Sequence, residues 1–317
     1  MKYFIASLLN LEKENLEPID VEIFPGVRLC SDNSIKEKIL TEDIIAYIGL
    51  FEYDSLMNNG LFLYYEFAEE DINKFNPDAT NIQVLHLLLN WINAFLRNSW
   101  IVKDNAIVIG TAYLIDDSSI TKNRDFSSLQ LQYKHTLADG GIRPIKLSRK
   151  ELDLMIEVHD KVEMYLSSKD SLLYKFPIVK NFSTIGRFLF FIKAARESRN
   201  LGHKVLNYCS SLETLFSTDN TEISHKIGER TAYFLSDGFN KKEVYEIIKK
   251  AYAIRSKLVH GSHINNKTIK ETPEISEKLD DILRKIFNLI FFDNEKLEIF
   301  DSNNSRINDY FIDLILG

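Results

Sequence analysis

The sequence has few cysteines and no long hydrophobic run. Its two cysteines, Cys30 and Cys209, lie far apart in 317 residues and match no metal-ligand or redox spacing. We therefore expect no essential disulfide and a reducing compartment. No window reaches the roughly 18 consecutive apolar residues typical of a membrane-spanning helix. The N-terminal stretch MKYFIASLLNLEKENL lacks the apolar core and cleavage site of a signal peptide, so we predict a cytoplasmic protein without a membrane partner.

Several common catalytic motifs are also missing. The sequence contains no Gly-rich phosphate loop, no CxxC or HExxH motif and no GxSxG elbow. These absences argue against an NTPase, a zinc protease and an α/β-hydrolase. We expect neither a cofactor nor a resident metal.

Negative charge exceeds positive charge overall, but positive charge is concentrated locally. The formal net charge is −7, which argues against attraction of nucleic acid to the whole surface. Residues 241–270, KKEVYEIIKKAYAIRSKLVHGSHINNKTIK, nevertheless hold eight Lys and Arg against two Glu. This local excess of positive charge surrounds an arginine and a histidine that are five residues apart.

The two parts of the chain differ in periodicity, with a change near residue 148. Short runs with strand character precede it, at residues 21–24, 61–67, 106–115 and 129–133. The nearly continuous apolar stretch at 82–97 predicts a buried helix between them. We predict an α+β N-terminal domain over residues 1–145 that senses a trigger or guides a substrate.

Helical periodicity dominates from Ser148 onward, where Gly and Pro become sparse. The sequence SRKE at 148–151 fits a capping box at a helix start. An apolar stripe from Leu201 to Phe216 indicates a helix that begins near Ile185. Further helices are expected at 221–236, 241–260 and 273–292, followed by a C-terminal segment whose apolar spacing predicts docking. We predict that residues 146–317 form an all-α bundle with a C-terminal docking helix.

Residues 251–263, AYAIRSKLVHGSH, place Arg255 and His260 near a predicted helix end. Positions five apart differ by about 140° around a helix, so the two side chains converge only if the helix frays or tightens. Gly261 stands where a left-handed cap is expected. His260 would then lie in the last turn, where the helix dipole favours the imidazolium.

An arginine and a histidine together suit cleavage of a phosphodiester. A histidine deprotonates an RNA 2′-hydroxyl or protonates the departing 5′-oxygen, and an arginine stabilises charge on the phosphorane without a metal. However, 12 Arg and 7 His in 317 residues give about a quarter of such a pair per chain by chance. A histidine at a helix end also serves simply as a partner of the dipole, so the spacing alone is weak evidence.

Three segments resemble the HEPN superfamily, and in particular its ApeA-like branch. They are NYCSSLETLFS (207–217), TEISHKIGERTAYFL (221–235) and AYAIRSKLVHG (251–261). The last is similar to the family's Tyr-x-x-Arg-(Ser/Asn)-x-(Leu/Ile)-Val-His-Gly helix end. Their order and spacing fit as well. The resemblance covers roughly residues 150–295 and does not extend convincingly into the first 145.

The resemblance implies a four- to five-helix bundle that forms a homodimer and acts as a metal-independent endoribonuclease. Many family members act in phage defence, abortive infection or toxin–antitoxin pairs. Position by position, Arg255 and His260 match the catalytic pair and Glu213 an acidic position on a neighbouring helix. Ser256 replaces the Asn or Asp that many active members carry after the arginine. The implied partners are RNA such as tRNA, a second copy, and an antitoxin or phage trigger.

The roles of the remaining charged residues are less specific. Lys249, Lys250, Lys257 and Arg230 are candidates for RNA binding, although a structural ion pair is the favoured role for Arg230. Glu213 either orients Arg255 or His260 or is a structural carboxylate.

Two alternative functions remain open at this point. The helical part could be a non-catalytic HEPN-like module that binds RNA, nucleotide or a partner protein, as Ser256 and the acidic overall charge suggest. In the other alternative, the aromatic-rich strands of the N-terminal domain form a ligand pocket and carry the specific function.

Overall fold

The structure is a computed structural model that describes residues 2–16, 18–67, 79–116, 125–131, 134–169, 182–218 and 223–317. The chain divides into two compact units. The first comprises Met1–Ser99, Asn105–Lys134 and Arg143–His159, and the second comprises Trp100–Asp104, His135–Ile142 and Asp160–Gly317. Two short segments of the predicted N-terminal domain therefore belong to the second unit.

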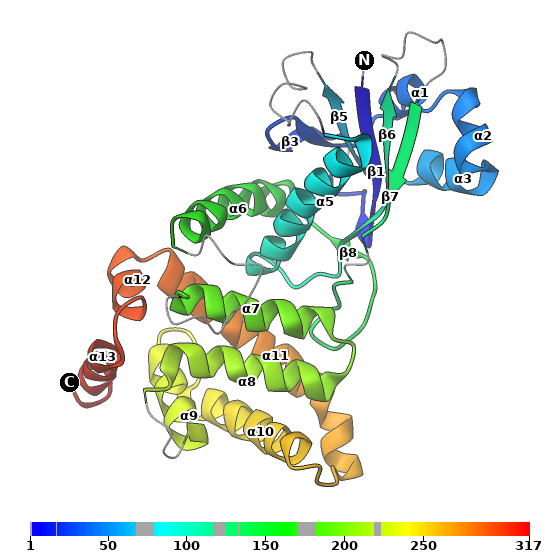
Figure 1. The fold of residues 1–317 in the computed structure, drawn as a ribbon. Coiled ribbons are helices and arrows are strands. Elements are labelled where there is room, and N and C mark those ends of the chain that lie inside the picture. The colour runs from blue at the N-terminus through cyan, green and yellow to red at the C-terminus, as the bar shows by residue number, and fades with distance from the viewer. Residues whose placement is uncertain are drawn as a thin grey trace. The chain divides into compact units, whose positions relative to one another are not determined.

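A six-stranded antiparallel sheet forms the centre of the first unit, in the order β3-β4-β5-β1-β6-β7 (Figure 1). Its strands are β1 (Lys2–Leu9), β3 (Asp20–Phe24), β4 (Val27–Cys30), β5 (Phe62–Phe67), β6 (Val108–Asp116) and β7 (Asp125–Leu129). A separate parallel pair joins β2 (Leu11–Glu12) to β8 (Ile145–Lys146). Six consecutive residues of β1 are buried, as expected for a central strand covered on both faces.

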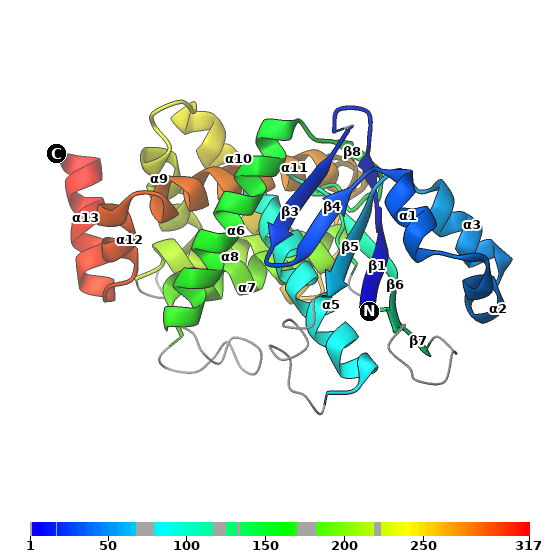
Figure 2. The same cartoon turned by 90° about the horizontal axis from the view of Figure 1, so that it is seen from above.

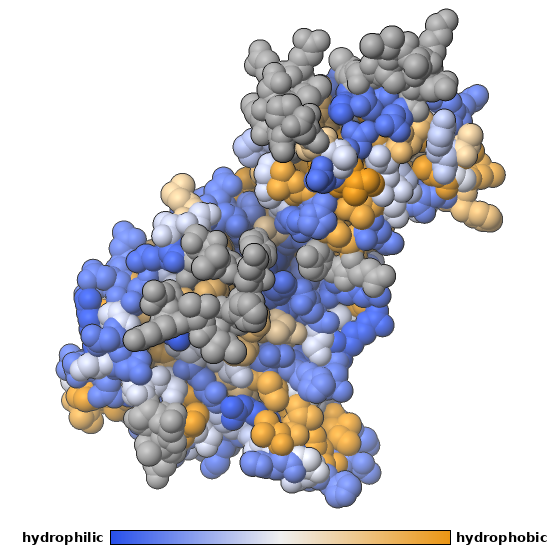
Figure 3. Space-filling view, viewed as in Figure 1, coloured by the Kyte–Doolittle hydropathy of each residue, from blue (hydrophilic) through white to orange (hydrophobic). Residues whose placement is uncertain are grey.

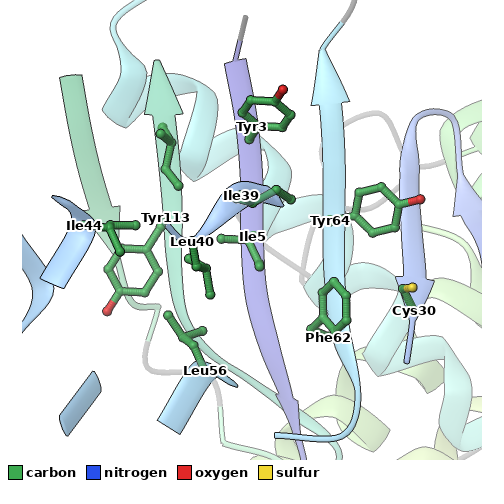
Figure 4. Close-up of a cluster of buried hydrophobic side chains, with 11 residues drawn as sticks. Tyr3, Ile5, Cys30, Ile39, Leu40, Ile44, Leu56, Phe62, Tyr64 and Tyr113 are labelled. Carbon is green, nitrogen blue, oxygen red and sulfur yellow. The ribbon is translucent and has the colours of Figure 1, made fainter. Parts of the chain in front are cut away.

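Helices cover both faces of this sheet (Figure 2). Helix α5 (Asn81–Asn98) packs against β6 and β7. The opposite face is covered by α1 (Asn33–Ile39), η1 (Glu42–Ile44), α2 (Ile45–Ile48) and α3 (Leu50–Asn58). A buried cluster joins Ile39, Ile44 and Leu56 of these elements to Ile5 and Tyr113 of the sheet (Figure 4). The first unit is therefore a sheet between two helical layers.

The second unit is built from helices. They are α7 (Thr184–Glu197), α8 (Leu201–Phe216), α9 (Ile223–Phe234), α10 (Lys241–Val259), α11 (Asn266–Phe291), α12 (Asn294–Phe300) and α13 (Asn304–Leu316). Helix α6 (Arg149–Lys169) is divided between the units at His159, and η2 (Ser99–Ile101) also lies at a division. Helix α8 packs against α7, α9, α10 and α11, so it is the central helix of the bundle.

The tail helix α13 docks through aromatic side chains. Phe311 is 1% exposed, and its ring centroid lies 5.2 Å from that of Phe216 and 6.1 Å from that of Phe300. Phe234 completes the cluster from α9. Four elements thus share one aromatic core, which explains the apolar spacing of the C-terminal segment.

A buried carboxylate connects the segment at residues 100–104 to the helices of the second unit. Asp280 of α11 is 1% exposed. It accepts hydrogen bonds from the indole nitrogen of Trp100 at 2.8 Å and from the hydroxyl of Tyr208 at 2.6 Å, and it pairs with Arg284. These contacts explain why residues 100–104 belong to this unit.

Further buried charges surround this carboxylate. Lys204 is fully buried and donates to Thr136 Oγ1 at 2.9 Å and to the Ala195 carbonyl at 2.8 Å. Asp104 accepts from the backbone N–H of Ala138 at 2.9 Å. Thr136 and Ala138 belong to the segment at residues 135–142, which is thereby held against α7 and α8.

Burial perturbs the ionisation of this cluster. It raises the pKa of Asp104 to about 6, with a further contribution from the negative charge of Asp280. It lowers the pKa of Lys204 to about 8 and that of Arg196 to about 10. Desolvation therefore outweighs the attraction between opposite charges in the cluster.

The predicted succession of an α+β region and an all-α region is confirmed. The capping box is also present, because the Glu151 amide donates to Ser148 Oγ at 3.2 Å and the Ser148 amide to Glu151 Oε2 at 2.7 Å. None of the helices in the described part of the chain combines the length and apolar character that crossing a bilayer requires.

Some predicted boundaries were wrong. The helix expected from Ile185 is two helices, because Asn200 caps the start of α8 by accepting from the His203 amide. The strand expected at 129–133 is β7, which ends at Leu129; residues 132 and 133 lie outside the described residues. Helix α11 begins seven residues before Pro273, and residues 221 and 222 of the expected helix 221–236 are outside the described residues.

Candidate functional site

The C-terminus of α10 has the geometry that its sequence predicts. His260 is the C-cap, and Gly261 adopts the left-handed conformation with φ of 64°. The Ser262 amide donates to the Lys257 carbonyl at 2.8 Å, and the Gly261 amide donates to the Leu258 carbonyl at 3.3 Å. This pair of bonds is a Schellman motif, and it fixes the chain direction directly after His260.

The helix does not fray before His260. The His260 amide still donates to the Ser256 carbonyl at 3.0 Å, as in a regular helix. The expected angular difference of about 140° between Arg255 and His260 is therefore retained. The convergence through fraying that the sequence allowed does not occur within one chain.

Arg255 is directed toward α8, where it meets Glu213. Its Nη2 atom lies 3.2 Å from both carboxylate oxygens of Glu213, and the two side chains are 30% and 23% exposed. The hydroxyl of Tyr252 donates to Oε1 of the same carboxylate at 3.1 Å. The structure thus brings Arg255 and Glu213 together, as an orienting role for Glu213 requires, while His260 lies at the exposed helix end.

The antiparallel packing of α8 and α10 produces this arrangement. Gly202, near the start of α8, faces Leu258 near the end of α10. Near the other end of α8, Glu213 bonds to Tyr252 and Arg255 of α10. Between these contacts, the carbonyl oxygen of Cys209 on α8 lies 3.5 Å from the Tyr252 hydroxyl on α10.

The surroundings of this pair suppress ionisation of two neighbouring groups. Burial raises the pKa of the Tyr252 phenol, and the nearby Cys209 and Glu213 raise it further. Burial also raises the pKa of the Cys209 thiol, which the positive charge of Arg255 only partly offsets. Tyr252 is therefore a hydrogen-bond donor throughout the physiological range, and Cys209 is an unreactive buried thiol.

The predicted RNA-binding lysines lie along α10. Lys249 and Lys250 are exposed, and Lys257 is partly exposed. The ammonium group of Lys249 lies 5.8 Å from the ring centroid of Tyr245. Ser256 is also exposed. Lys249 and Lys250 therefore precede Arg255 along the helix, and Lys257 lies between Arg255 and His260.

Exposed apolar side chains adjoin the same helix end. Val259 is 59% exposed, and Ile269 of α11 is 54% exposed. Figure 3 shows a hydrophobic area in the region where Figure 1 places the end of α10 and the start of α11. The site therefore combines positive charge with exposed apolar surface.

Arg230 is buried, unlike the lysines of α10. It is 5% exposed, and its Nη1 donates to the Phe216 carbonyl at 2.8 Å and to Thr218 Oγ1 at 3.2 Å. Its Nη2 donates to Asn308 Oδ1 at 2.6 Å, and its guanidinium carbon lies 4.8 Å from the Phe311 ring centroid. These contacts join α8, α9 and α13 and favour the structural role over RNA binding.

Sequence reasoning assigned no role to Tyr252, although it belongs to the motif that suggested the site. Its position three residues before Arg255 indicates that the two side chains are neighbours, since residues three apart share a helix face. Its contact with Glu213 depends on the register between α8 and α10, which local sequence does not specify.

Comparisons with models of protein families, with curated proteins and with solved structures find no match to this chain. The likeness to the HEPN superfamily therefore rests on the three sequence segments, and membership of that family is a proposal.

Proposed function

We propose that this protein is a metal-independent endoribonuclease of the HEPN type that works as a homodimer. The observation that carries the proposal is the end of α10. There, a guanidinium oriented by Glu213 and an exposed histidine at the helix cap lie on the helix that carries the exposed Lys249 and Lys250 and the partly exposed Lys257. Phosphate binding and proton transfer are the two functions that RNA cleavage requires.

The proposed reaction is an internal transesterification of RNA. His260 accepts the proton of a 2′-hydroxyl, whose oxygen attacks the adjacent phosphorus. The bond between phosphorus and the 5′-oxygen breaks, and His260 of a second copy donates a proton to that oxygen. Arg255 stabilises the charge of the phosphorane. The products are a 2′,3′-cyclic phosphate and a 5′-hydroxyl end.

The geometry of α10 supports a site composed of two chains. Within one chain, Arg255 pairs with Glu213 on α8 while His260 lies at the exposed helix end. A second copy packed on this end would add another arginine and histidine and would cover the exposed Val259. In a dimer with two-fold symmetry, each contact across the interface occurs twice, once from each chain.

RNA cleavage in EDTA tests the proposal. We expect the wild-type protein to cut total RNA or tRNA and His260→Ala to lose at least about 100-fold in rate, which is the usual contribution of a general acid or base. His263→Ala is the matched control, because His263 is exposed three residues further along. Identical RNA profiles for wild type and His260→Ala would refute the proposal.

A second candidate function is a binding module without catalysis. The pairing of Arg255 Nη2 with Glu213 and the serine at position 256 favour it. Such a module would bind RNA with an affinity that falls steeply with salt and does not change in His260→Ala. Absence of cleavage together with this behaviour would favour binding over catalysis.

The proposed biological setting is phage defence, abortive infection or a toxin–antitoxin pair in the cytoplasm, with the first unit sensing a trigger. Expression in bacteria tests this setting. Wild-type protein should slow growth when triggered or when an antitoxin is absent, and His260→Ala should not.

A further inference from the structure

Tyr252, Glu213 and Arg255 form a closed group of three side chains. The Tyr252 hydroxyl donates to Glu213 Oε1 at 3.1 Å, and Arg255 Nη2 lies 3.2 Å from the same carboxylate. The guanidinium carbon of Arg255 also lies 5.6 Å from the Tyr252 ring centroid. Each side chain therefore interacts with the other two, by hydrogen bonds to the carboxylate and by a cation–π interaction between Arg255 and Tyr252.

The tyrosine is the most deeply buried member of this group. Tyr252 is 6% exposed, whereas the side chains of Arg255 and Glu213 are 30% and 23% exposed. Its hydroxyl also lies 3.5 Å from the Cys209 carbonyl, a longer contact than that with Glu213. A carboxylate is the stronger acceptor, so the single hydroxyl proton is directed to Glu213.

This hydrogen bond limits how Glu213 can pair with Arg255. An unrestrained carboxylate and guanidinium tend to form two parallel hydrogen bonds. Here one carboxylate oxygen is engaged by Tyr252, and Arg255 is bonded through Nη2. Its Nε atom is buried and has no partner among the described residues, so an anion does not reach it. The Nη1 group takes part in neither contact with Glu213, and the side chain is 30% exposed. This group is the part of the guanidinium that is available to an anion.

We infer that Tyr252 is a positioning residue for Arg255. By holding Glu213 it keeps the guanidinium over its ring and prevents full pairing between the two charges, so that Arg255 can bind the scissile phosphate of RNA. This inference rests on the proposed ribonuclease function for its substrate. The geometric part, control of Arg255 through Glu213, does not depend on catalysis.

Tyr252→Phe removes the hydroxyl and keeps the ring. We expect kcat/KM for RNA in EDTA to fall about tenfold, as for loss of a hydrogen bond to a charged group. Because the hydroxyl acts through Glu213, the same change in a Glu213→Gln background should have a much smaller effect. Tyr245→Phe, on the same helix, is the control and should leave the rate unchanged.

The guanidinium NMR signals of Arg255 provide a readout that is independent of catalysis. We expect Tyr252→Phe to shift the Arg255 Nε–Hε resonance and to reduce its further shift on addition of inorganic phosphate, with Tyr245→Phe matching the wild type. Unchanged Arg255 signals in a folded Tyr252→Phe protein would overturn the inference, as would additive effects of the two substitutions on cleavage. A wild type that cuts no RNA would instead refute the proposed function, and the NMR result would still decide the positioning role.

Discussion

Asp104 gives a quantitative prediction about stability. Its pKa is raised from 3.8 to about 6, chiefly by burial and then by repulsion from Asp280. A folded-state pKa above the unfolded value means that stability is greatest below the unfolded pKa and is lost as pH rises through the folded one. The folded protein therefore loses stability between about pH 4 and pH 6.

The magnitude follows from the difference between the two pKa values. One pKa unit corresponds to about 1.36 kcal/mol, so the charged carboxylate costs about 3 kcal/mol at pH 7. In Asp104→Asn, the amide oxygen can replace Oδ2 as acceptor for the Ala138 amide. The NH2 group of the asparagine would then take the position of Asp104 Oδ1, which is buried and has no partner among the described residues. That unpaired group costs about 1 kcal/mol, which leaves a net stabilisation of about 2 kcal/mol.

Urea unfolding at pH 7 and pH 4 measures this effect. Trp100 fluorescence in a Trp91→Phe background reports on the second unit, because the Trp100 indole bonds to Asp280. We expect Asp104→Asn to raise the free energy of unfolding at pH 7 and to lose this advantage at pH 4. The exposed Asp237→Asn is the control. Equal stability of Asp104→Asn and wild type at pH 7 would refute the reasoning.

Three further predictions concern the second unit. Gly261→Ala should reduce the free energy of unfolding by about 1 kcal/mol in urea titrations, because a φ of 64° disfavours any residue with a side chain. The cost is one of backbone conformation, since no atom lies within 4 Å of the added carbon. The control Ser262→Ala should have little effect. Phe311→Ala should lower the free energy of unfolding by about 3 kcal/mol in the same assay, because Phe311 is 1% exposed. Leu316 is 81% exposed, so Leu316→Ala should leave the free energy of unfolding almost unchanged. Equal effects of the two substitutions would contradict the docking of α13. Since the pKa of Lys204 is lowered from 10.5 to about 8, the free energy of unfolding should rise as pH increases from 8 to 10.5. Lys204→Met should remove most of that rise. A wild-type free energy of unfolding that stays constant over this pH range would contradict the burial of the Lys204 charge.

Features that depend on neighbouring residues in the sequence could be predicted. The capping box at Ser148 and the left-handed Gly261 follow from local hydrogen bonding and backbone freedom, and both are present. The helical tail also followed from its periodicity. The division between an α+β region and a helical region followed from the change in period near residue 148.

Features that depend on distant pairing could not be predicted in the same way. The register of β7 is set by its pairing with β6, in which Leu129 lies opposite Ala112. The alternation of apolar and polar residues instead predicted a strand at 129–133, which begins at the residue where β7 ends. Central strand β1 was overlooked because its apolar run has no alternation. The contact between Glu213 and Arg255 spans 42 residues and depends on helix packing, as does the role of Tyr252.

The chemical nature of RNA ends tests the central claim most directly. Wild-type protein is incubated with a defined RNA in EDTA, and the fragments are analysed by mass spectrometry. Attack by a 2′-hydroxyl at the α10 site predicts 2′,3′-cyclic phosphate and 5′-hydroxyl ends that disappear in both Arg255→Ala and His260→Ala. Intact RNA, or fragments with 5′-phosphate ends that persist in these variants, would contradict the claim.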